Sequence, residues 1–292
     1  MTLRDWLLIS IIGIGWGSSF MFNAILLQDM GPLSISAGRI FFGALACWTY
    51  VIATGRMTPI SALMFGNLLV LGVVMYAAPF SLYPLAQADL ASGLTGIVNA
   101  MTPIMVVIVS HLWPGGERAT VLKSLGVLCG FAGIVLLAWP ALGEGSELWA
   151  IVTAWTATLC YAVALNWSRR VRSLHSSVQA AMGLSLAFAV LVPFVMRFEG
   201  LPHVVGLNHW AALIFMGSVL TGVSFLIMWS MIPRIGATNA STVTFIAPVS
   251  AVILGALVLG EQILPAHLLG GVTIFLGLLL VDGRLFRRRK LN

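Results

Sequence analysis

Apolar stretches of about twenty residues recur along almost the whole chain, and short polar segments separate them. Because roughly 20 apolar residues are needed to cross the hydrocarbon core of a bilayer, each stretch is long enough to be a transmembrane helix. No connector is long enough to hold a soluble domain. The pattern therefore predicts an all-α polytopic membrane protein with ten transmembrane helices, near 6–28, 34–53, 63–84, 91–112, 121–139, 148–168, 176–196, 210–230, 239–259 and 267–285.

The composition supports this interpretation. Residues of the AVILMFWYC set make up 60% of the 292 positions, charged residues make up 8%, and the mean hydropathy is +1.03. A water-soluble domain of this length would need far more polar surface. The three cysteines lie within separate apolar stretches and form no CxxC pair, so we expect neither a disulfide framework nor a metal site, and no cofactor.

The net charge of +6 comes from basic residues that occur in short groups between the apolar stretches, which argues against nucleic-acid binding and predicts topology instead. Short loops rich in Lys and Arg stay in the cytoplasm, so both termini are predicted to be cytoplasmic. Thirteen of the fifteen basic residues fall on that side: Arg4, Arg56, Arg118, Lys123, Arg169, Arg170, Arg172, Arg234, Arg284, Arg287, Arg288, Arg289 and Lys290. Arg197 and six acidic residues fall on the other: Asp29, Asp89, Glu144, Glu147, Glu199 and Glu261.

The chain contains an internal repeat, with halves at 1–142 and 143–292. Glu117 and Glu261 are each followed by glycines nine and sixteen residues later, and the paired positions are Pro103 with Pro248, Gly116 with Gly260, Gly126 with Gly270 and Gly133 with Gly277. Because each half holds five helices, the second half enters the membrane inverted. Inverted repeats place a substrate site near the bilayer midplane and permit alternating access.

These features resemble a known group of transporters. The Trp16-Gly17-Ser18 segment, the paired Pro…Gly-Glu…Gly…Gly blocks and the five-plus-five layout are similar to the drug/metabolite transporter superfamily, EamA type, over nearly the whole chain. Within it, the length and the aromatic-rich spans resemble YddG-type aromatic amino acid exporters of bacterial inner membranes. The resemblance implies ten helices around a central cavity, and export of amino acids or similar metabolites.

Aromatic and neutral polar residues recur at helical spacing inside several spans, and we expect them to line a substrate cavity. Tyrosine and tryptophan combine a flat apolar face with one hydrogen-bond donor, which suits amphipathic or aromatic solutes. The alternative is a belt at the headgroup level, where Trp and Tyr also gather. The candidates are Trp16, Phe20, Tyr76, Phe80, Tyr83, Thr95, Asn99, Tyr161, Trp229 and Thr244.

Arg39 is the one plainly charged residue within a predicted span. A lipid-facing arginine at mid-span costs about 3 kcal/mol on translocon scales, so we expect Arg39 to face the protein interior or an outward-open cavity, where it could hold a substrate carboxylate. The alternative is that its side chain extends to the headgroups.

Pro103 and Pro248 are expected to kink their helices near the midplane. A helical proline leaves the carbonyl four residues earlier without its N–H partner, which frees the carbonyls of Asn99 and Thr244. Lipid cannot satisfy these groups, so they are expected to face a cavity and hold a substrate ammonium, with packing against a neighbouring helix as the alternative. A bulky side chain at Gly96 is then expected to block transport.

Glu117 and Glu261 precede the fifth and tenth spans and are expected to stabilise the N-termini of those helices. The Gly13–Gly17 and Gly126–Gly130 pairs are expected to let helices approach closely.

The sequence favours a transporter of a small molecule in contact with membrane lipid. The spans lack the ionisable or metal-binding groups that an intramembrane enzyme needs, so we expect no enzymatic activity. Efflux of drugs or other metabolites, and a channel, remain alternatives. The oligomeric state stays open, and a monomer is compatible with the sequence.

Overall fold

The computed structural model describes residues 2–141, 145–201, 206–235 and 243–283, and this part of the chain is helical throughout its regular structure. Within the described residues, nine helical segments are long and apolar enough to cross a membrane, and Val243–Leu259 is a shorter apolar helix. Residues 236–242, where the predicted ninth span begins, lie outside the described residues. The predicted all-α membrane fold is confirmed.

The first repeat contains five spans, two of which depart from a regular α-helix. The third span is continuous but changes to π-helix in its middle, and the fourth is divided into two helices. The elements are α1 (Leu3–Leu26), α2 (Pro32–Ala53), α3 (Ala62–Gly72), η1 (Val73–Ala77), α4 (Ala78–Gln87), α5 (Ser92–Asn99), α6 (Thr102–Leu112) and α7 (Val121–Ala138), followed by a short η2 (Trp139–Ala141).

The second repeat follows the same order. Its elements are α8 (Gly145–Trp167), η3 (Ser168–Arg170), α9 (Ser176–Phe198), α10 (Gly206–Phe215), η4 (Met216–Val223), α11 (Ser224–Ile235), α13 (Val243–Leu259) and α14 (Pro265–Asp282). The π-helical segment η4 lies in the third span of its repeat, as η1 does in the first repeat. Such segments are rare and often mark functional sites in helices.

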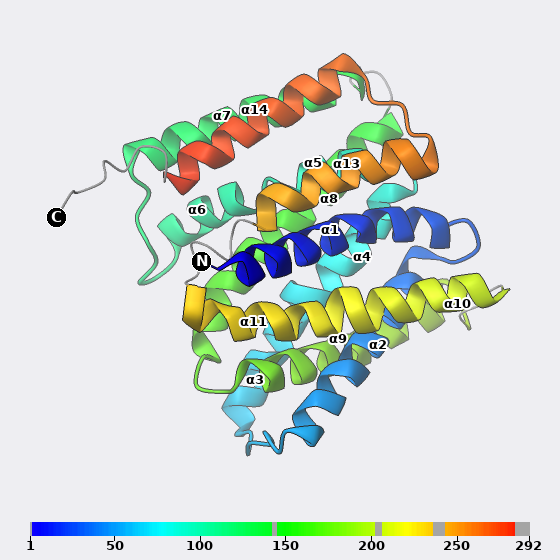
Figure 1. The fold of residues 1–292 in the computed structure, drawn as a ribbon, viewed down its shortest axis with the longest axis vertical. Helices are drawn as coiled ribbons and strands as arrows, with labels where there is room; N and C mark the ends of the chain where they lie inside the picture. The colour runs from blue at the N-terminus through cyan, green and yellow to red at the C-terminus, as the bar shows by residue number, and fades with distance from the viewer. Residues whose placement is uncertain (1, 142–144, 202–205, 236–242, 284–292) are drawn as a thin grey trace.

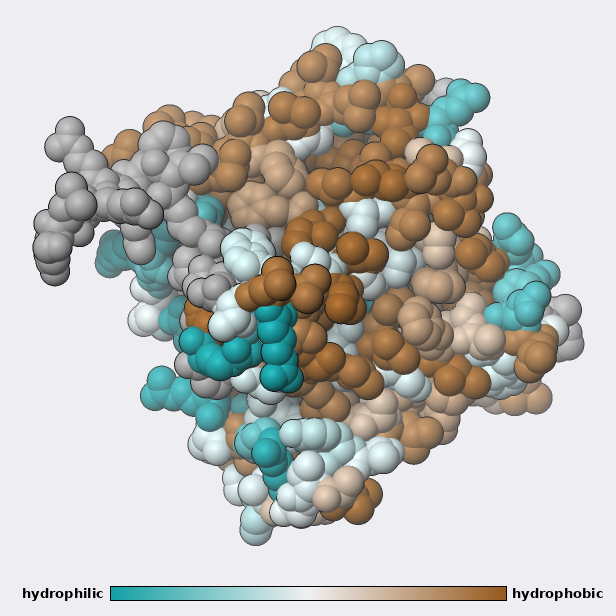
Figure 2. All heavy atoms as spheres, viewed as in Figure 1, coloured by the Kyte–Doolittle hydropathy of each residue, from teal (hydrophilic) through white to brown (hydrophobic). Residues whose placement is uncertain are grey.

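The helices pack across the two repeats. In Figure 1, α7 and α14 lie side by side along one edge of the molecule, α1 lies beside α13, and α2 packs on α9. Many large apolar side chains on the flanks are exposed, such as Ile11, Phe194 and Leu257. Figure 2 shows brown apolar residues over the flank of the bundle and teal hydrophilic residues toward its two ends. This is the surface expected of a protein surrounded by lipid.

We name the two ends of the helical bundle after the charged residues in their loops, the basic end and the acidic end. At the basic end, the loop after α2 contacts the loop before α9 through Arg56 Nη1 and His175 Nε2, 2.9 Å apart. Arg169 in the same region donates to the Gly115 carbonyl, 3.4 Å away, in the loop before α7. At the acidic end, Nε2 of His209, in the first turn of α10, lies 3.2 Å from Oδ2 of Asp29, in the loop after α1. Among the described residues, these contacts place basic loops at one end and Asp29 at the other, as the sequence predicts. Glu144, Arg284, Arg287, Arg288, Arg289 and Lys290 lie outside the described residues.

The α7–α14 pair shows that the repeats are related by a two-fold axis. A Cβ at Gly126 would lie 2.7 Å from the Gly277 carbonyl oxygen, and a Cβ at Gly270 would lie 2.8 Å from that of Gly133. Since Gly126 corresponds to Gly270 in the repeat, and Gly133 to Gly277, the two contacts are equivalent. The glycines allow the backbones to touch, as in other close helix pairs.

Candidate functional site

Aromatic side chains from four spans meet in the middle of the bundle. The Phe20 and Tyr83 rings pack edge to face with centroids 5.4 Å apart, and Tyr83 lies 6.2 Å from Tyr161. A second group continues from it, in which Tyr76 lies 6.0 Å from Phe80 and 5.7 Å from Phe225, and Trp16 lies 5.5 Å from Phe225. We call these residues the aromatic cluster.

The aromatic cluster is closed in this conformation. Phe20, Tyr76, Phe80 and Tyr83 are each no more than 6% exposed, so they pack against one another and do not line an open chamber. Trp16 is held in the interior because its Nε1 donates to the Leu220 carbonyl, 3.1 Å away in η4. These residues are thus placed inside the protein and not in an interfacial belt, while their part in substrate binding stays a prediction.

Arg39 of α2 points into the same region. Its guanidinium carbon lies 4.1 Å from the Phe80 ring centroid. The Nε atom donates to the Thr221 hydroxyl at 2.9 Å, and Nη2 donates to the Ser19 hydroxyl at 3.3 Å. Its surroundings are hydroxyls and an aromatic face, and none of the ion pairs found in the described residues involves it. Arg39 therefore lies in the protein interior, as expected, and its side chain does not extend toward the headgroups.

A polar network lies beside the cluster where the fourth span is interrupted. The Tyr83 hydroxyl donates to Asn99 Oδ1 at 2.6 Å. The Thr102 hydroxyl donates to the Asn99 carbonyl oxygen at 2.8 Å. Asn99 is the last residue of α5, and α6 begins at Thr102.

The structure corrects the expectation for Pro103. This proline lies in the first turn of α6, where a missing N–H costs nothing, and not in the interior of a kinked helix. The Asn99 carbonyl is not free for a substrate ammonium, since the Thr102 hydroxyl occupies it. Pro248 does lie inside α13 and is buried, as expected.

A cavity of about 310 Å³ opens next to this interruption. The cavity lies between α6, the start of α13 and the C-terminal end of α14, on the side of the basic end. A volume near this value is at the lower limit of small-molecule sites. It is lined by Thr102, Pro103, Val106, Val107, Ser110, Glu117, Lys123, Leu165, Thr244 and Val281. Among the predicted site residues, Pro103 and Thr244 therefore line a cavity.

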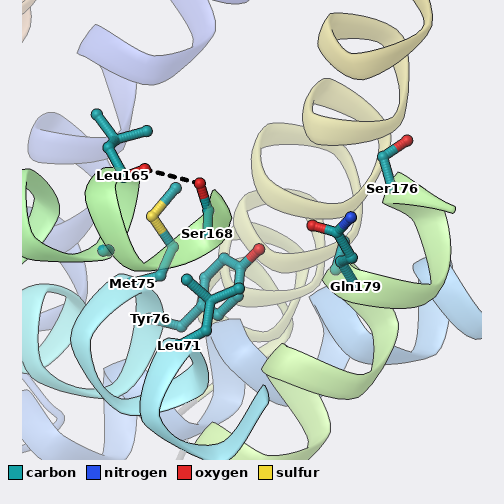
Figure 3. Close-up of a pocket in the computed structure, with 9 residues that line it drawn as sticks. Leu71, Met75, Tyr76, Leu165, Ser168, Ser176 and Gln179 are labelled. Carbon is teal, nitrogen blue, oxygen red and sulfur yellow. Dashed lines mark hydrogen bonds between the residues drawn. The ribbon is translucent and has the colours of Figure 1, made fainter. Parts of the chain in front are cut away.

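Tyr76 lines a different and much smaller space. Figure 3 shows its side chain among Leu71, Met75 and residues from the ends of α8 and α9, including Gln179. This space measures about 20 Å³, enough for a single water. It is therefore too small for an amino acid.

Two predicted positions have other surroundings than expected. The Thr95 hydroxyl donates to the Ala91 carbonyl of its own helix at 3.0 Å, and Thr95 is fully buried. A Cβ at Gly96 would lie 2.4 Å from the Ala251 Cβ, so a bulky residue there would separate α5 from α13 whether or not substrate binds nearby. The side chain of Trp229 lies outside the described residues.

Sequence reasoning missed several interior contacts. Asn23 Nδ2 donates to Gln87 Oε1 at 3.0 Å, and Gln87 Nε2 donates to the Phe20 carbonyl at 2.8 Å, so an amide pair joins α1 to α4. Their helical spacing relative to Phe20 and Tyr83 was the available signal. The π-helical segments, which supply Tyr76 and Thr221, had no signal in the sequence.

The two repeat glutamates also differ from expectation. Glu261 binds the N-terminus of α5 in the other repeat, and not that of α14. Glu117 is exposed and pairs with Lys123 in the first turn of α7. Among the described residues, no group of three or more His, Cys, Asp or Glu side chains could hold a metal ion.

Relatives of the chain include two proteins that are transporters by name. It is 25% identical to "Uncharacterized transporter YoaV" of Bacillus subtilis, with 94% of this chain and 95% of that protein aligned. It is 22% identical to "Uncharacterized inner membrane transporter YedA" of Escherichia coli K12, with 92% and 88% aligned. It is 26% identical to "Protein PecM" of Dickeya dadantii, with 94% and 91% aligned.

A solved crystal structure shares the fold, with a TM-score of 0.69 over the full length of both chains and 20% sequence identity. The model of the EamA-like transporter family matches this sequence twice, at residues 5–139 and 148–282. Its two copies cover most of the chain, each over one set of five spans. The protein is therefore a multi-pass membrane protein that belongs to the EamA-like transporter family.

Proposed function

We propose that this transporter exports amino acids with aromatic or other neutral, hydrophobic side chains, or related small metabolites, across a bacterial inner membrane. The observation that carries the proposal is the Arg39 guanidinium, held in the interior by two hydroxyls and an aromatic ring. A buried cation without a carboxylate partner is costly, and a substrate carboxylate would supply the missing charge.

The remaining groups fit the rest of such a substrate. The aromatic cluster can pack against an apolar or aromatic side chain, and the Tyr83–Asn99 pair offers neutral hydrogen-bonding groups. A substrate ammonium could be held by the Asn99 and Tyr83 oxygens once their mutual bond opens. The halves at 1–142 and 143–292 would alternate around this site, with both termini in the cytoplasm. We propose no enzymatic step and no cofactor.

The test is counterflow in proteoliposomes that contain the purified protein. Vesicles loaded with an unlabelled aromatic amino acid should take up the labelled form saturably, and the corresponding amine, which lacks the carboxylate, should compete poorly. Running the assay with and without a pH gradient separates facilitated exchange from proton-coupled export.

Other outcomes would point elsewhere. Exchange of the amine or of organic cations, with none of the amino acid, would favour drug efflux and refute the role of Arg39. Flux that does not saturate, together with conductance in a planar bilayer, would favour a channel.

A further inference from the structure

Glu261 joins the two repeats at the acidic end. It lies in the loop after α13, in the second repeat, and its side chain reaches the start of α5 in the first. Oε1 accepts a hydrogen bond from the Ser92 N–H at 2.6 Å, and Oε2 accepts one from the Gly93 N–H at 2.9 Å. The first N–H groups of a helix have no partner within it and favour negative charge, so a carboxylate here makes two strong bonds.

The backbone around Glu261 leaves room for this contact. Its own N–H donates to the Gly255 carbonyl at 3.1 Å, and Gly260 before it has a φ of 68°, which favours glycine. A Cβ at Gly255 would lie 2.3 Å from Glu261 Oε2. The Ser92 hydroxyl is buried beside the carboxylate and has no hydrogen-bond partner among the described atoms. The carboxylate is therefore held in one position between α5 and α13.

The two ends of the α5–α6 and α13 interface differ. Near the acidic end, α5 and α13 touch closely, since a Cβ at Gly93 would lie 3.2 Å from the Val252 Cα. Toward the basic end, α6 and the first turn of α13 both border the cavity of about 310 Å³, which Val107 of α6 and Thr244 of α13 line. The interface is thus shut at one end and hollow at the other, and the hollow reaches Thr102 beside Asn99.

We propose that Glu261 is a latch that holds the acidic end of the transport path shut while the cavity admits substrate from the basic end. This inference rests on the proposed transport between the repeats. To open the acidic end, α5 must part from α13, and both bonds to Glu261 must break. Loss of these bonds therefore favours the conformation that is open at the acidic end.

Glu199 provides a matched control. It lies after α9 and also accepts two backbone N–H bonds across the repeats, from Leu33 and Ser34 of α2, each at 2.8 Å. Unlike the α5–α6 span and α13, which border the cavity at one end, helices α2 and α9 pack together through residues such as Ala37, Ile40, Val51, Val178 and Leu191. Removing the Glu199 carboxylate therefore weakens the N-terminus of α2. It does not loosen the helices that border the cavity.

The test measures the accessibility of single cysteines in the full-length protein, without substrate, after Cys47, Cys129 and Cys160 are replaced by alanine. Thr95→Cys places a nearly isosteric thiol at a fully buried position in α5, and Val106→Cys places one in the wall of the cavity. In the parent protein, a soluble maleimide should label the cavity position rapidly and the α5 position slowly. Glu261→Gln should raise labelling at the α5 position about tenfold, as expected for loss of a charged hydrogen bond.

The controls decide the interpretation. In Glu261→Gln, labelling at the cavity position should stay constant or fall, and Glu199→Gln should leave the α5 position unchanged. The latch is refuted if Glu261→Gln leaves the α5 position protected, if it raises both positions together as general unfolding would, or if Glu199→Gln has the same effect. Because no transport is measured, a negative counterflow result would refute the proposed function and leave this result standing.

Discussion

Arg39 is the residue whose environment the proposed function depends on most. Its guanidinium lies over Phe80 and donates to Ser19 and Thr221, which come from three different helical segments. Such a position fixes the charge in the interior, where an arriving carboxylate could meet it without displacing a protein carboxylate.

Arg39→Gln tests this role. The substitution keeps a polar side chain that can bond the two hydroxyls but removes the charge. Transport of a carboxylate-bearing substrate should fall ten- to a hundredfold, roughly the value of a charge-assisted hydrogen bond. Transport of the matching amide, which has no carboxylate, should fall much less. The measurement is counterflow of the two compounds in one preparation, and an equal loss of both would indicate a structural role.

Tyr83→Phe tests the polar network. It removes the bond of 2.6 Å to Asn99 and leaves the packing against Phe20 in place. The free energy of unfolding should fall by about 1 kcal/mol, the usual net contribution of one hydrogen bond. Counterflow should fall several-fold if the hydroxyl takes part in substrate binding. Asn99→Leu, which removes the acceptor, should have a similar effect, whereas wild-type kinetics in both variants would place the site elsewhere.

At the scale of elements, the paired glycines of α7 and α14 set how closely these helices approach. Gly126→Leu should lower the thermal unfolding midpoint, because a Cβ there would lie 2.7 Å from the Gly277 carbonyl oxygen. Overpacking of this kind costs about 1–3 kcal/mol or more. Gly66→Leu is the matched control, since a Cβ at Gly66 in α3 meets nothing within 4 Å. Equal midpoints for the two variants would contradict the packing role.

The start of α9 should depend on pH through His175. Partial burial and the nearby Arg56 cation lower the pKa of this imidazole below its usual value of 6.5, so the folded protein favours the neutral ring. As the pH falls, the unfolded chain takes up a proton first. The contribution of His175 to stability is therefore complete above its unfolded pKa and is lost as the pH falls through the lower folded pKa.

This gives a measurable difference between two proteins. Between about pH 7.5 and pH 5, the unfolding midpoint of the wild type should fall further than that of His175→Asn. Thermal unfolding of both proteins in matched buffers is the measurement. Parallel curves would show that folding does not lower the pKa of His175.

At the scale of the whole molecule, the charge distribution predicts the orientation. Ser173 lies in the exposed loop before α9 at the basic end, and Asp89 lies exposed between α4 and α5 at the acidic end. With the native cysteines replaced, an impermeant maleimide on intact cells should label Asp89→Cys and leave Ser173→Cys unlabelled until the membrane is permeabilised. The reverse pattern would invert the topology and the direction of the proposed latch.

The sequence alone determined the helical class, the positions of the spans, the repeat and the division of charge between the ends. The physical reason is that a bilayer requires every backbone polar group to bond within its own segment, so apolar length is enough to identify a helix. The glycine pattern likewise predicted close packing, because only glycine allows the backbone contacts seen at Gly126 and Gly277.

The tertiary structure decided which faces meet, because lipid-facing and protein-facing apolar residues look alike in sequence. Thr221 bonds Arg39 from 182 positions away, and Glu261 binds Ser92 from 169 positions away. Neither partner could be inferred from local spacing. Such contacts follow from how the two repeats pack together, which no single span specifies.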